Sequence, residues 1–491
     1  MIHGKNHIGY TLSAEGNKEL FARKAEDWSL LPEKFYTASK EEIERVGLQA
    51  ALAFNEYSKF SGSRRAEFLD AIAEEIENLG DELVQRAMTE TGLPQGRIEG
   101  ERGRTTGQLR LFAQLLREGS WVEARIETAM PDRAPVPKPD IRKMNNPLGP
   151  VAVFTASNFP LAFSTAGGDT ASALAAGCPV VVKAHESHLG TNSLVADAII
   201  KAAKRTEMPD GVFSSIQTFG YKMAQELVKH PRIKAVGFTG SKKGGMALHE
   251  VAAARPEPIP VYAEMGSVNP VLLFPDKLKT DAQGVADMYA NSITLGVGQF
   301  CTNPGILIGL KGEELDDFKA KLAKALHAVP EGVMLNQGIA SNFGLRKDEM
   351  KDNGVFEITS GTIDRSLASA TLATVSLQEF HKNPKLHEEV FGPYSIIVEC
   401  ENMSEMMIAI LKLKGQLTVN IMATDLDMEN EKSLINMMAE VAGRIVMNGA
   451  PTGVEVCYAM QHGGSFPAST DGKYTSVGQD AIKRFVKPVA Y

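Results

Sequence analysis

Cys301 follows a glycine-rich segment, Gly296-Val297-Gly298-Gln299-Phe300. In such a turn, backbone N–H groups can face a thiol, lower its pKa and later stabilise an oxyanion. The two glycines favour a turn because they add no packing to a strand or a helix. Cys301 is therefore a candidate nucleophile, and the alternative is a cysteine buried as a small apolar side chain.

Two further segments place a polar side chain where an apolar run ends. Glu264 follows the predicted strand at 259–263, and partial burial there would raise its pKa toward neutrality and suit a general base. Asn158 follows the apolar run 151–154, and its amide could donate to a developing oxyanion. Alone, Glu264 could also be a capping or ion-paired residue, and Asn158 a turn residue before Pro160.

Two segments are typical of nucleotide contacts. Residues 235–245 place glycines and the hydroxyl of Ser241 between a predicted strand and a helix N-terminus, where a phosphate can bind. Lys183 ends the apolar run 180–182, from which it could reach an adenosine ribose. The sequence has no GxGxxG fingerprint, and either segment could be an ordinary turn.

The elements around these segments must hold them in place. From residue 150 onward, short apolar runs alternate with helical patterns of roughly 10–15 residues, which indicates βαβ units and a parallel, doubly wound sheet. Ligands of such sheets bind at the carboxyl ends of the strands. We expect strands at 151–154, 180–182, 212–219, 233–238 and 259–263, and helices at 161–176, 191–204, 221–229 and 243–254. A second α/β region is expected from Asn269 to about Gln461, with strands near 270–274, 306–308, 395–398 and 444–447.

The rest of the chain has simpler patterns. Residues 40–119 show helical periodicity, which predicts a helical layer. The prolines between residues 129 and 150 exclude a continuous helix and predict an extended ribbon. Residues 481–488 alternate enough for an edge strand, which we expect to pair with the ribbon in one small sheet arm used for oligomer contacts.

In this order, the motifs resemble the aldehyde dehydrogenase superfamily over about residues 20–490. The matching motifs are Asn158-Phe159-Pro160, Lys183 to Glu186, Phe238-Thr239-Gly240-Ser241 with Gly245, Glu264-Met265-Gly266, Gly298-Gln299-Phe300-Cys301 and Glu389-Val390-Phe391-Gly392-Pro393. The resemblance implies two doubly wound parallel-sheet domains, a Rossmann-like cofactor domain and a catalytic domain, plus a small β oligomerisation arm. The expected boundaries are 1–124 and 148–263 for the NAD(P)-binding domain, 264–469 for the catalytic domain, and 125–147 and 470–491 for the arm.

The resemblance also implies a covalent mechanism. Cys301 would attack an aldehyde as a thiolate, while the Asn158 amide and the Cys301 backbone N–H stabilise the oxyanion. Hydride would then pass to the nicotinamide of NAD or NADP, and Glu264 would activate water to hydrolyse the thioester. The expected product is a carboxylic acid, and the expected partner is a small aldehyde.

By the same resemblance, Glu389 would hold the nicotinamide ribose, Phe391 would pack near the ring, and Ser241 would meet the pyrophosphate. The complete expected cofactor set is Thr155, Lys183, Glu186, Gly240, Ser241, Gly245, Glu389 and Phe391. A carboxylate of Glu186 that faces the ribose would repel a 2′-phosphate, whereas Lys183, His185 and His188 favour one. We therefore expect the enzyme to use NAD, or both NAD and NADP. The expected substrate pocket comprises Phe159, Phe163, Phe300, Thr302 and Cys457.

Departures from the superfamily pattern narrow the substrate. Ala156-Ser157 stands where many members have an aromatic residue, and the small residues at 164–168 leave room for a polar or longer aldehyde. With 183–185, 448–454 and His462-Gly463-Gly464, these features are similar to the branch that oxidises α-ketoglutarate semialdehyde (2,5-dioxopentanoate). Fatty aldehydes are the alternative within this branch.

Composition sets further limits. The chain has 491 residues and a net charge of −8, which disfavours a nucleic-acid partner. Its four cysteines are dispersed and its histidines lack ligand spacing, so we expect no metal and a reducing, cytoplasmic setting. No apolar stretch approaches about eighteen residues, so we expect no membrane span. A homodimer or homotetramer is expected.

Three other functions stay open. A CoA-acylating dehydrogenase would need no water-activating glutamate, and Glu264 argues against it. A non-catalytic protein that keeps the fold tends to lose the nucleophile, whereas Cys301 is present. A cysteine hydrolase would pair Cys301 with a histidine, which the sequence alone cannot exclude.

Overall fold

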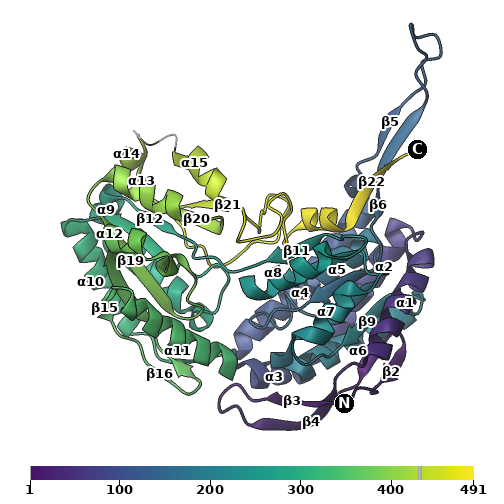
Figure 1. Ribbon diagram of the computed structural model, residues 1–491, viewed down its shortest axis with the longest axis horizontal. Helices are drawn as coiled ribbons and strands as arrows, with labels where there is room; N and C mark the ends of the chain where they lie inside the picture. Colours follow the sequence, from purple (N-terminus) through teal and green to yellow (C-terminus); the bar gives the residue numbers. More distant parts are fainter. Residues whose placement is uncertain (1, 430, 432–433) are drawn as a thin grey trace.

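The computed structural model describes residues 2–429, 431 and 434–491, and it contains two seven-stranded sheets in separate lobes (Figure 1). The first sheet has the order β11-β10-β7-β8-β9-β1-β2. Its parallel strands are β7 (Val151–Phe154), β8 (Val180–Lys183), β9 (Phe213–Ile216), β10 (Ala235–Thr239) and β11 (Val261–Glu264), and β1 (Asn6–Ile8) and β2 (Thr11–Ser13) continue it antiparallel. The chain runs from β7 to β9 on one side and returns to β10 on the other. This reversal creates a topological switch point between β7 and β10, where doubly wound sheets bind ligands.

Helices cover both faces of the first sheet because its strands are apolar on both faces. Val151, Val153 and Val182 belong to one core with helices α2, α4, α5 and α6, whereas Ala152 and Val181 belong to another with α1, α7 and α8. The helices are α1 (Lys40–Tyr57), α2 (Gly62–Asn78), α3 (Gly80–Thr91), α4 (Gln95–Glu118), α5 (Gly168–Ala176), α6 (Leu189–Arg205), α7 (Tyr221–Lys229) and α8 (Lys242–Ala253).

The second sheet has the order β15-β18-β19-β13-β12-β20-β21, and all of its strands except the antiparallel β15 (Phe356–Thr359) run parallel. The parallel strands are β12 (Val271–Leu273), β13 (Ile306–Leu310), β18 (Thr371–Ser376), β19 (Tyr394–Cys400), β20 (Gln416–Met422) and β21 (Ala442–Met447). The helices of this lobe are α9 (Pro275–Thr294), α10 (Glu313–His327), α11 (Gln337–Asp352), α12 (Leu377–Lys382), α13 (Met403–Lys412), α14 (Asp425–Met428) and α15 (Leu434–Val441). The predicted fold class, with two doubly wound α/β sheets, is confirmed.

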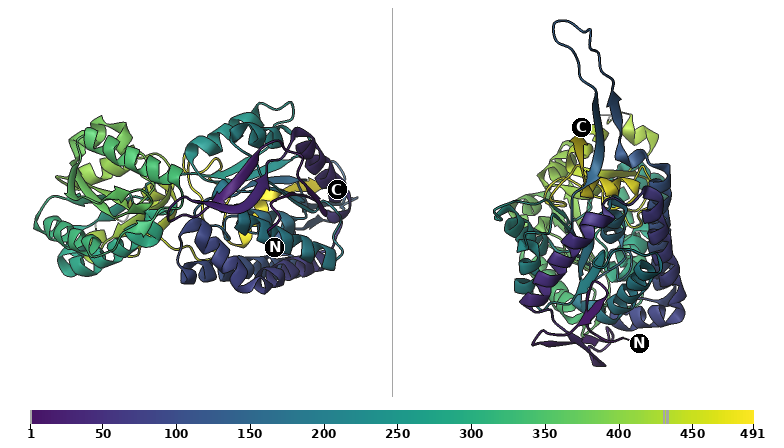
Figure 2. Two further views of the ribbon diagram at one scale, coloured as in Figure 1. Left: turned by 90° about the horizontal axis from the view of Figure 1, so that it is seen from below. Right: turned by 90° about the vertical axis from the view of Figure 1, so that its right-hand side faces the viewer.

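A third sheet forms an arm that projects from the first lobe (Figures 1 and 2). Its order is β22-β6-β5, from β5 (Arg125–Glu127), β6 (Ile141–Pro147) and β22 (Val486–Ala490). Val486 pairs with Pro147 and Ala490 with Lys143, so the C-terminal strand pairs with the proline-rich ribbon. The use of the arm in oligomer contacts stays a prediction, as do the domain boundaries.

The remaining short strands form two small sheets. These strands are β3 (Glu19–Arg23), β4 (Leu30–Tyr36), β14 (Gly332–Val333), β16 (Ile363–Asp364) and β17 (Leu367–Ala368).

Two expectations from the sequence are wrong in detail. The helix expected at 161–176 begins only at Gly168, because Glu101 accepts hydrogen bonds from the backbone N–H groups of Leu161 and Ala162 and holds this segment in turns. The strand expected at 481–488 begins only at Val486.

The residues before Val486 form a 3₁₀ helix, η5 (Gln479–Phe485). Its buried side chains Ala481, Ile482 and Phe485 recur at helical spacing, which explains why the segment does not alternate like a strand. In the described part of the chain, no helix is long and apolar enough to cross a membrane.

Candidate active site

The two lobes bring three reactive side chains together. His462 Nε2 lies 3.7 Å from Cys301 Sγ and 3.0 Å from Glu264 Oε1. The other carboxylate oxygen, Glu264 Oε2, accepts a hydrogen bond of 2.6 Å from the hydroxyl of Ser476. The structure therefore places the predicted nucleophile beside the predicted base and adds a histidine that the sequence patterns had not connected with them.

The loop before Cys301 has the backbone that its glycines suggested. After α9 the chain forms a tight turn, η3 (Leu295–Gly298), in which Gly296 and Gly298 have φ values of 56° and 65°. A Cβ on Gly298 would lie 2.3 Å from the carbonyl carbon of Gly392, so a side chain here would collide with the segment that carries Glu389. The side-chain amide of Asn269 then donates to the Cys301 carbonyl at 2.8 Å and fixes the reactive residue.

Asn158 lies in the turn that follows β7. Its amide Nδ2 donates a 2.9 Å hydrogen bond to the carbonyl of Gln299, two residues before Cys301. The structure thus brings the predicted oxyanion donor to the loop that carries the thiol.

The electrostatics of the site differ from the sequence expectation. Burial favours the neutral form of Glu264, but the neighbouring His462 and the hydrogen bond from Ser476 outweigh it and hold the pKa of this carboxyl below its usual range. The expectation of a raised pKa is therefore wrong, because it omitted the effect of a histidine contributed from elsewhere in the chain.

The pKa of the Cys301 thiol also differs from the sequence expectation, in the opposite direction. Burial, followed by the charge of Glu264, raises the pKa of Cys301 well above its ordinary value. The expected lowering by backbone N–H groups is therefore not found in this arrangement. The thiol is held in its protonated form beside an ionised carboxylate that can accept its proton.

The predicted phosphate-binding segment forms the start of α8. Ser241 caps the helix, and its hydroxyl accepts a hydrogen bond of 3.2 Å from the N–H of Gly244. Two glycines are needed for packing here. A Cβ on Gly240 would lie 2.8 Å from the ring of Phe238, and one on Gly245 would lie 2.7 Å from Sδ of Met265.

The other residues of the first lobe that are predicted to bind the cofactor lie at the ends of neighbouring strands. Thr155, directly after β7, donates through its hydroxyl to the carbonyl of Lys183 at 3.2 Å. Lys183 Nζ lies 4.0 Å from Glu186 Oε1, and burial lowers the pKa of this lysine in spite of that carboxylate. These residues lie at the carboxyl ends of the neighbouring strands β7 and β8.

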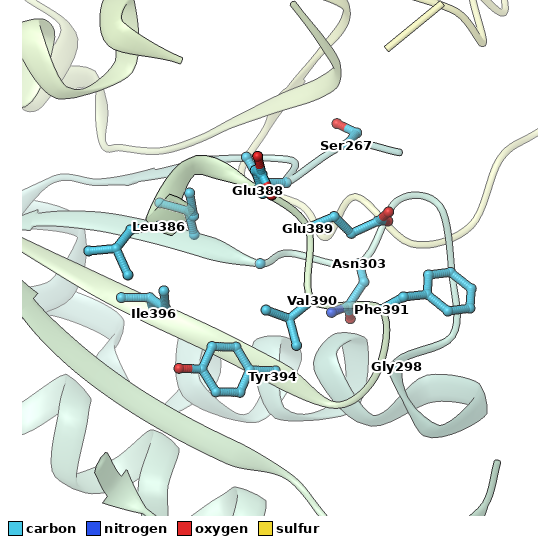
Figure 3. A pocket seen from close by; sticks show the side chains of 13 residues that line it. Ser267, Gly298, Asn303, Leu386, Glu388, Glu389, Val390, Phe391, Tyr394 and Ile396 are labelled. Atoms are coloured by element: carbon cyan, nitrogen blue, oxygen red, sulfur yellow. The ribbon is translucent and has the colours of Figure 1, made fainter. Parts of the chain in front are cut away.

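Glu389 and Phe391 lie in the loop before β19, beside the loop that carries Gly298 (Figure 3). They line a small pocket with Ser267, Gly298 and Asn303. Burial raises the pKa of the Glu389 carboxyl to about 8. Gly266 makes room for this carboxyl, since a Cβ there would lie 2.3 Å from Glu389 Oε2.

Three of the predicted substrate-pocket residues form an aromatic cluster. The ring centroid of Phe159 lies 5.1 Å from that of Phe163 and 5.2 Å from that of Phe300. Val454, Val456 and Met460 pack against this cluster, so the loop that contains the half-buried Cys457 lies beside it. Thr302 is buried, with 1% of its surface exposed, next to the nucleophile in the chain.

Sequence reasoning missed His462, Ser476 and two arginines of α4, Arg97 and Arg104, which lie over the aromatic cluster. In the sequence, His462 belongs to a motif with two glycines, and no spacing along the chain connects it with Cys301. Its Nε2, Cys301 Sγ and a Glu264 oxygen lie close enough to hold a metal ion. The expectation of no metal stays a prediction.

Residues 32–488 match the aldehyde dehydrogenase family, and the chain belongs to this family of oxidoreductases, which oxidise aldehydes to acids. It is 50% identical over 460 residues to "Alpha-ketoglutaric semialdehyde dehydrogenase 2" of Azospirillum brasilense, covering 93% of this chain and 88% of that protein. It is 45% identical to "Alpha-ketoglutaric semialdehyde dehydrogenase" of Acinetobacter baylyi, covering 100% of this chain and 93% of that protein. The resemblance inferred from the motifs is confirmed.

Solved structures share the fold at lower identity. Apo betaine aldehyde dehydrogenase of Staphylococcus aureus matches with a TM-score of 0.86 and 19% identity, covering 100% of this chain and 95% of that chain. A 3,6-anhydro-L-galactose dehydrogenase in complex with NAP matches with a TM-score of 0.84 and 21% identity, covering 99% of both chains.

Proposed function

We propose that this chain oxidises α-ketoglutaric semialdehyde to α-ketoglutarate, with NAD or NADP as the hydride acceptor. The observation that carries the proposal is the 50% identity over 93% of the chain to a dehydrogenase named for this substrate. The small residues beside Asn158 and the two arginines over the aromatic cluster support a polar aldehyde. Fatty aldehydes are the second candidate, favoured only by the apolar lining of Phe159, Phe163 and Phe300.

In the proposed first step, Cys301 Sγ attacks the aldehyde carbon. The thiol must first lose its proton, and Glu264, held anionic beside it, is the proposed acceptor. The carbonyl oxygen becomes an oxyanion, which the Cys301 backbone N–H and the amide of Asn158 stabilise. An amide carries two N–H donors, so Asn158 can keep its bond to Gln299 while it donates to the oxyanion.

Glu264 must first pass the thiol proton to solvent. In the proposed last step it then takes a proton from water, which attacks the thioester carbon; the C–S bond breaks, the acid is released and Cys301 leaves as a thiolate. The hydrogen bond from Ser476 fixes one carboxylate oxygen, while the oxygen near His462 faces the thiol side of the site. His462 is proposed as a positioning residue that keeps Glu264 ionised. The cluster therefore performs both proton transfers with one carboxylate.

The residues present fit a dinucleotide. The N-terminus of α8, capped by Ser241, offers backbone N–H groups to a pyrophosphate, and Gly245 lies in the first turn of this helix. The carboxyl of Glu389, buried without a charged partner among the described side chains around it, suits ribose hydroxyls. When bound, the nicotinamide accepts the hydride. Thr155, Lys183, Glu186 and Gly240 would border the adenosine half, and Phe391 the nicotinamide.

We also propose an oligomeric state and a cellular setting for the protein. The exposed apolar side chains Ile126, Met130, Val136, Ile141 and Met144 of the arm support a homodimer or homotetramer assembled through it. All four cysteines are free in the structure, which supports a reducing, cytoplasmic setting.

The deciding experiment measures kcat/KM for 2,5-dioxopentanoate, succinic semialdehyde, glycolaldehyde and a long-chain aldehyde, with NAD and with NADP and without CoA. We expect the highest value for 2,5-dioxopentanoate. Preference for the long-chain aldehyde would overturn the proposed substrate, and NAD(P)H formation that depends on CoA would identify an acylating dehydrogenase instead.

A further inference from the structure

Two guanidinium groups of α4 lie over the aromatic side chains beside the thiol. The Cζ atom of Arg104 is 5.2 Å from the ring centroid of Phe163, and that of Arg97 is 4.4 Å from the centroid of Phe159. The ring of Phe163 in turn lies 6.2 Å from that of His462. A single layer of side chains therefore separates Arg104 from the reactive cluster.

Arg104 lacks partners for donors that are out of contact with solvent. Its Nε and Nη2 atoms are buried and make no hydrogen bond within the described part of the chain. Arg97 pairs through Nη1 with Glu101 at 3.2 Å, but its Nε and Nη2 are also buried without a partner. Buried donors are normally satisfied, because leaving them unpaired costs free energy. These atoms therefore indicate a missing acceptor.

The carboxylates around the two guanidinium groups leave these nitrogens without an acceptor. Glu101 Oε2 pairs with Nη1 of Arg97, whereas its Oε1 already accepts from the backbone N–H groups of Leu161 and Ala162 at 2.9 Å. The charge of Glu264 also acts on Arg104, but Glu264 accepts from Ser476 and lies beside His462. Burial lowers the pKa of the Arg104 guanidinium, which remains charged at neutral pH. An anion bound at this place would supply acceptors for the unpartnered guanidinium nitrogens.

We infer that Arg104, supported by Arg97, binds the carboxylate at the end of the substrate remote from its aldehyde group. The inference rests on the proposed function and names the residue that would select α-ketoglutaric semialdehyde over neutral aldehydes. A planar guanidinium fork matches a carboxylate with two parallel hydrogen bonds. Phe159 and Phe163 would contact the methylene groups between the two ends of the substrate.

The test compares Arg104→Met with the native enzyme on 2,5-dioxopentanoate and on pentanal, which has the same chain length but no carboxylate. We expect kcat/KM for 2,5-dioxopentanoate to fall by roughly 100-fold, mostly through KM, because a charge-assisted bidentate pair is lost. Pentanal should be unaffected or improved. Arg104→Lys should recover part of the loss, since it restores the charge without the fork.

The matched control is Arg110→Met on the same helix, whose guanidinium pairs with the exposed Glu77 at 2.6 Å on the far side. It should leave both substrates unchanged. Inhibition by glutarate gives a second readout that needs no turnover, and its Ki should rise in Arg104→Met to a similar degree. Should Arg104→Met fail to fold, Arg104→Lys alone must lower kcat/KM for 2,5-dioxopentanoate by roughly tenfold without affecting pentanal.

The experiment distinguishes failure of the proposed function from failure of the role assigned to Arg104. A native enzyme that does not prefer 2,5-dioxopentanoate to pentanal would overturn the proposed function. A native enzyme that has this preference and keeps it in Arg104→Met, with the Ki of glutarate unchanged, would overturn the role of Arg104 alone. Equal losses on both aldehydes would show that Arg104 only supports the fold, and would also overturn the inference.

Discussion

Glu264 Oε1 lies 3.0 Å from Nε2 of His462, so a buried carboxylate is partnered by an equally buried imidazole. Burial alone would favour the neutral acid. The histidine reverses this and leaves an anionic base beside a thiol that is protonated. The proton on sulfur and its acceptor are thus both in place before an aldehyde arrives.

Replacing His462 with Asn should move the acidic limb of the pH profile. Without the imidazole, burial is left to dominate and the pKa of Glu264 rises, so the carboxylate forms only at higher pH. Each unit of this rise costs about tenfold in activity below the new pKa. We expect kcat at pH 6 to fall roughly tenfold more than kcat at pH 9. The exposed His327, changed to Asn, is the control, and an unshifted profile would contradict the role of His462.

Replacing Glu264 with Gln should have opposite effects on turnover and on thiol reactivity. Steady-state oxidation should fall by roughly 10²–10⁴-fold, because water loses its base. The pKa of Cys301 should fall, since the charge of Glu264 is one cause of its elevation. Alkylation by iodoacetamide at pH 7.5, followed by mass spectrometry, should therefore be faster than in the native enzyme.

Cys301→Ser provides the control for the label and for the chemistry. It should not be labelled at this position, and its NAD(P)H formation should fall by roughly 10³-fold or more. Turnover that survives in Cys301→Ser would refute the covalent mechanism. The same treatment of Cys457→Ser, in the neighbouring loop, should leave Cys301 labelling intact.

Glu186→Gln should raise the efficiency with NADP. The carboxylate lies at the end of β8 near Lys183, and its charge would repel a 2′-phosphate. Relief of about 1.4 kcal/mol corresponds to a tenfold gain in kcat/KM with NADP, while the value with NAD should fall or stay level. Glu226→Gln, which removes another carboxylate on the same lobe, should change neither. A ratio of the two cofactors that does not move would remove Glu186 from the proposed site.

Charges placed on the arm should reduce the size of the assembly. Ile126 and Met144 are exposed by 64% and 42%, and a double change of both to Glu would place anions in the proposed contact. Light scattering after size-exclusion chromatography should then report a smaller species. Leu345→Glu, exposed by 70% on α11, should leave the mass unchanged. The same mass in all three proteins would show that assembly does not use the arm.

The parts of the fold that could be predicted are those with one dominant pattern. Helix α7 matches its predicted range because Ala224, Leu227 and Val228 repeat at helical spacing. Strand β20 is not among the predicted strands, and its alternation of Gln416, Thr418 and Asn420 with apolar residues is typical of a strand with one exposed face, yet the strand is buried along its whole length. Gln416 instead hydrogen-bonds Ser267 across the fold, a partner that no local pattern reveals.

The local sequence also predicts only part of the site. Cys301, Glu264 and Asn158 were recognisable because each lies next to a turn that the local sequence specifies, with Gly298 at a positive φ. His462 was not connected with them, because its position depends on the packing of two lobes. The role of Arg104 cannot be predicted from the sequence either, because on a helix with many charged residues only unpartnered nitrogens, like those of Arg97, distinguish it.

The pairing of β22 with β6 has a consequence for how the protein is made. Roughly 340 residues separate the two strands. At about 5–20 residues per second, a ribosome needs roughly 20–70 s to synthesise these intervening residues. During that interval β6 has β5 on one edge and an open edge on the other. Both lobes can fold before the arm is finished, and until β22 is made the open edge of β6 is exposed to pairing with a strand of another chain.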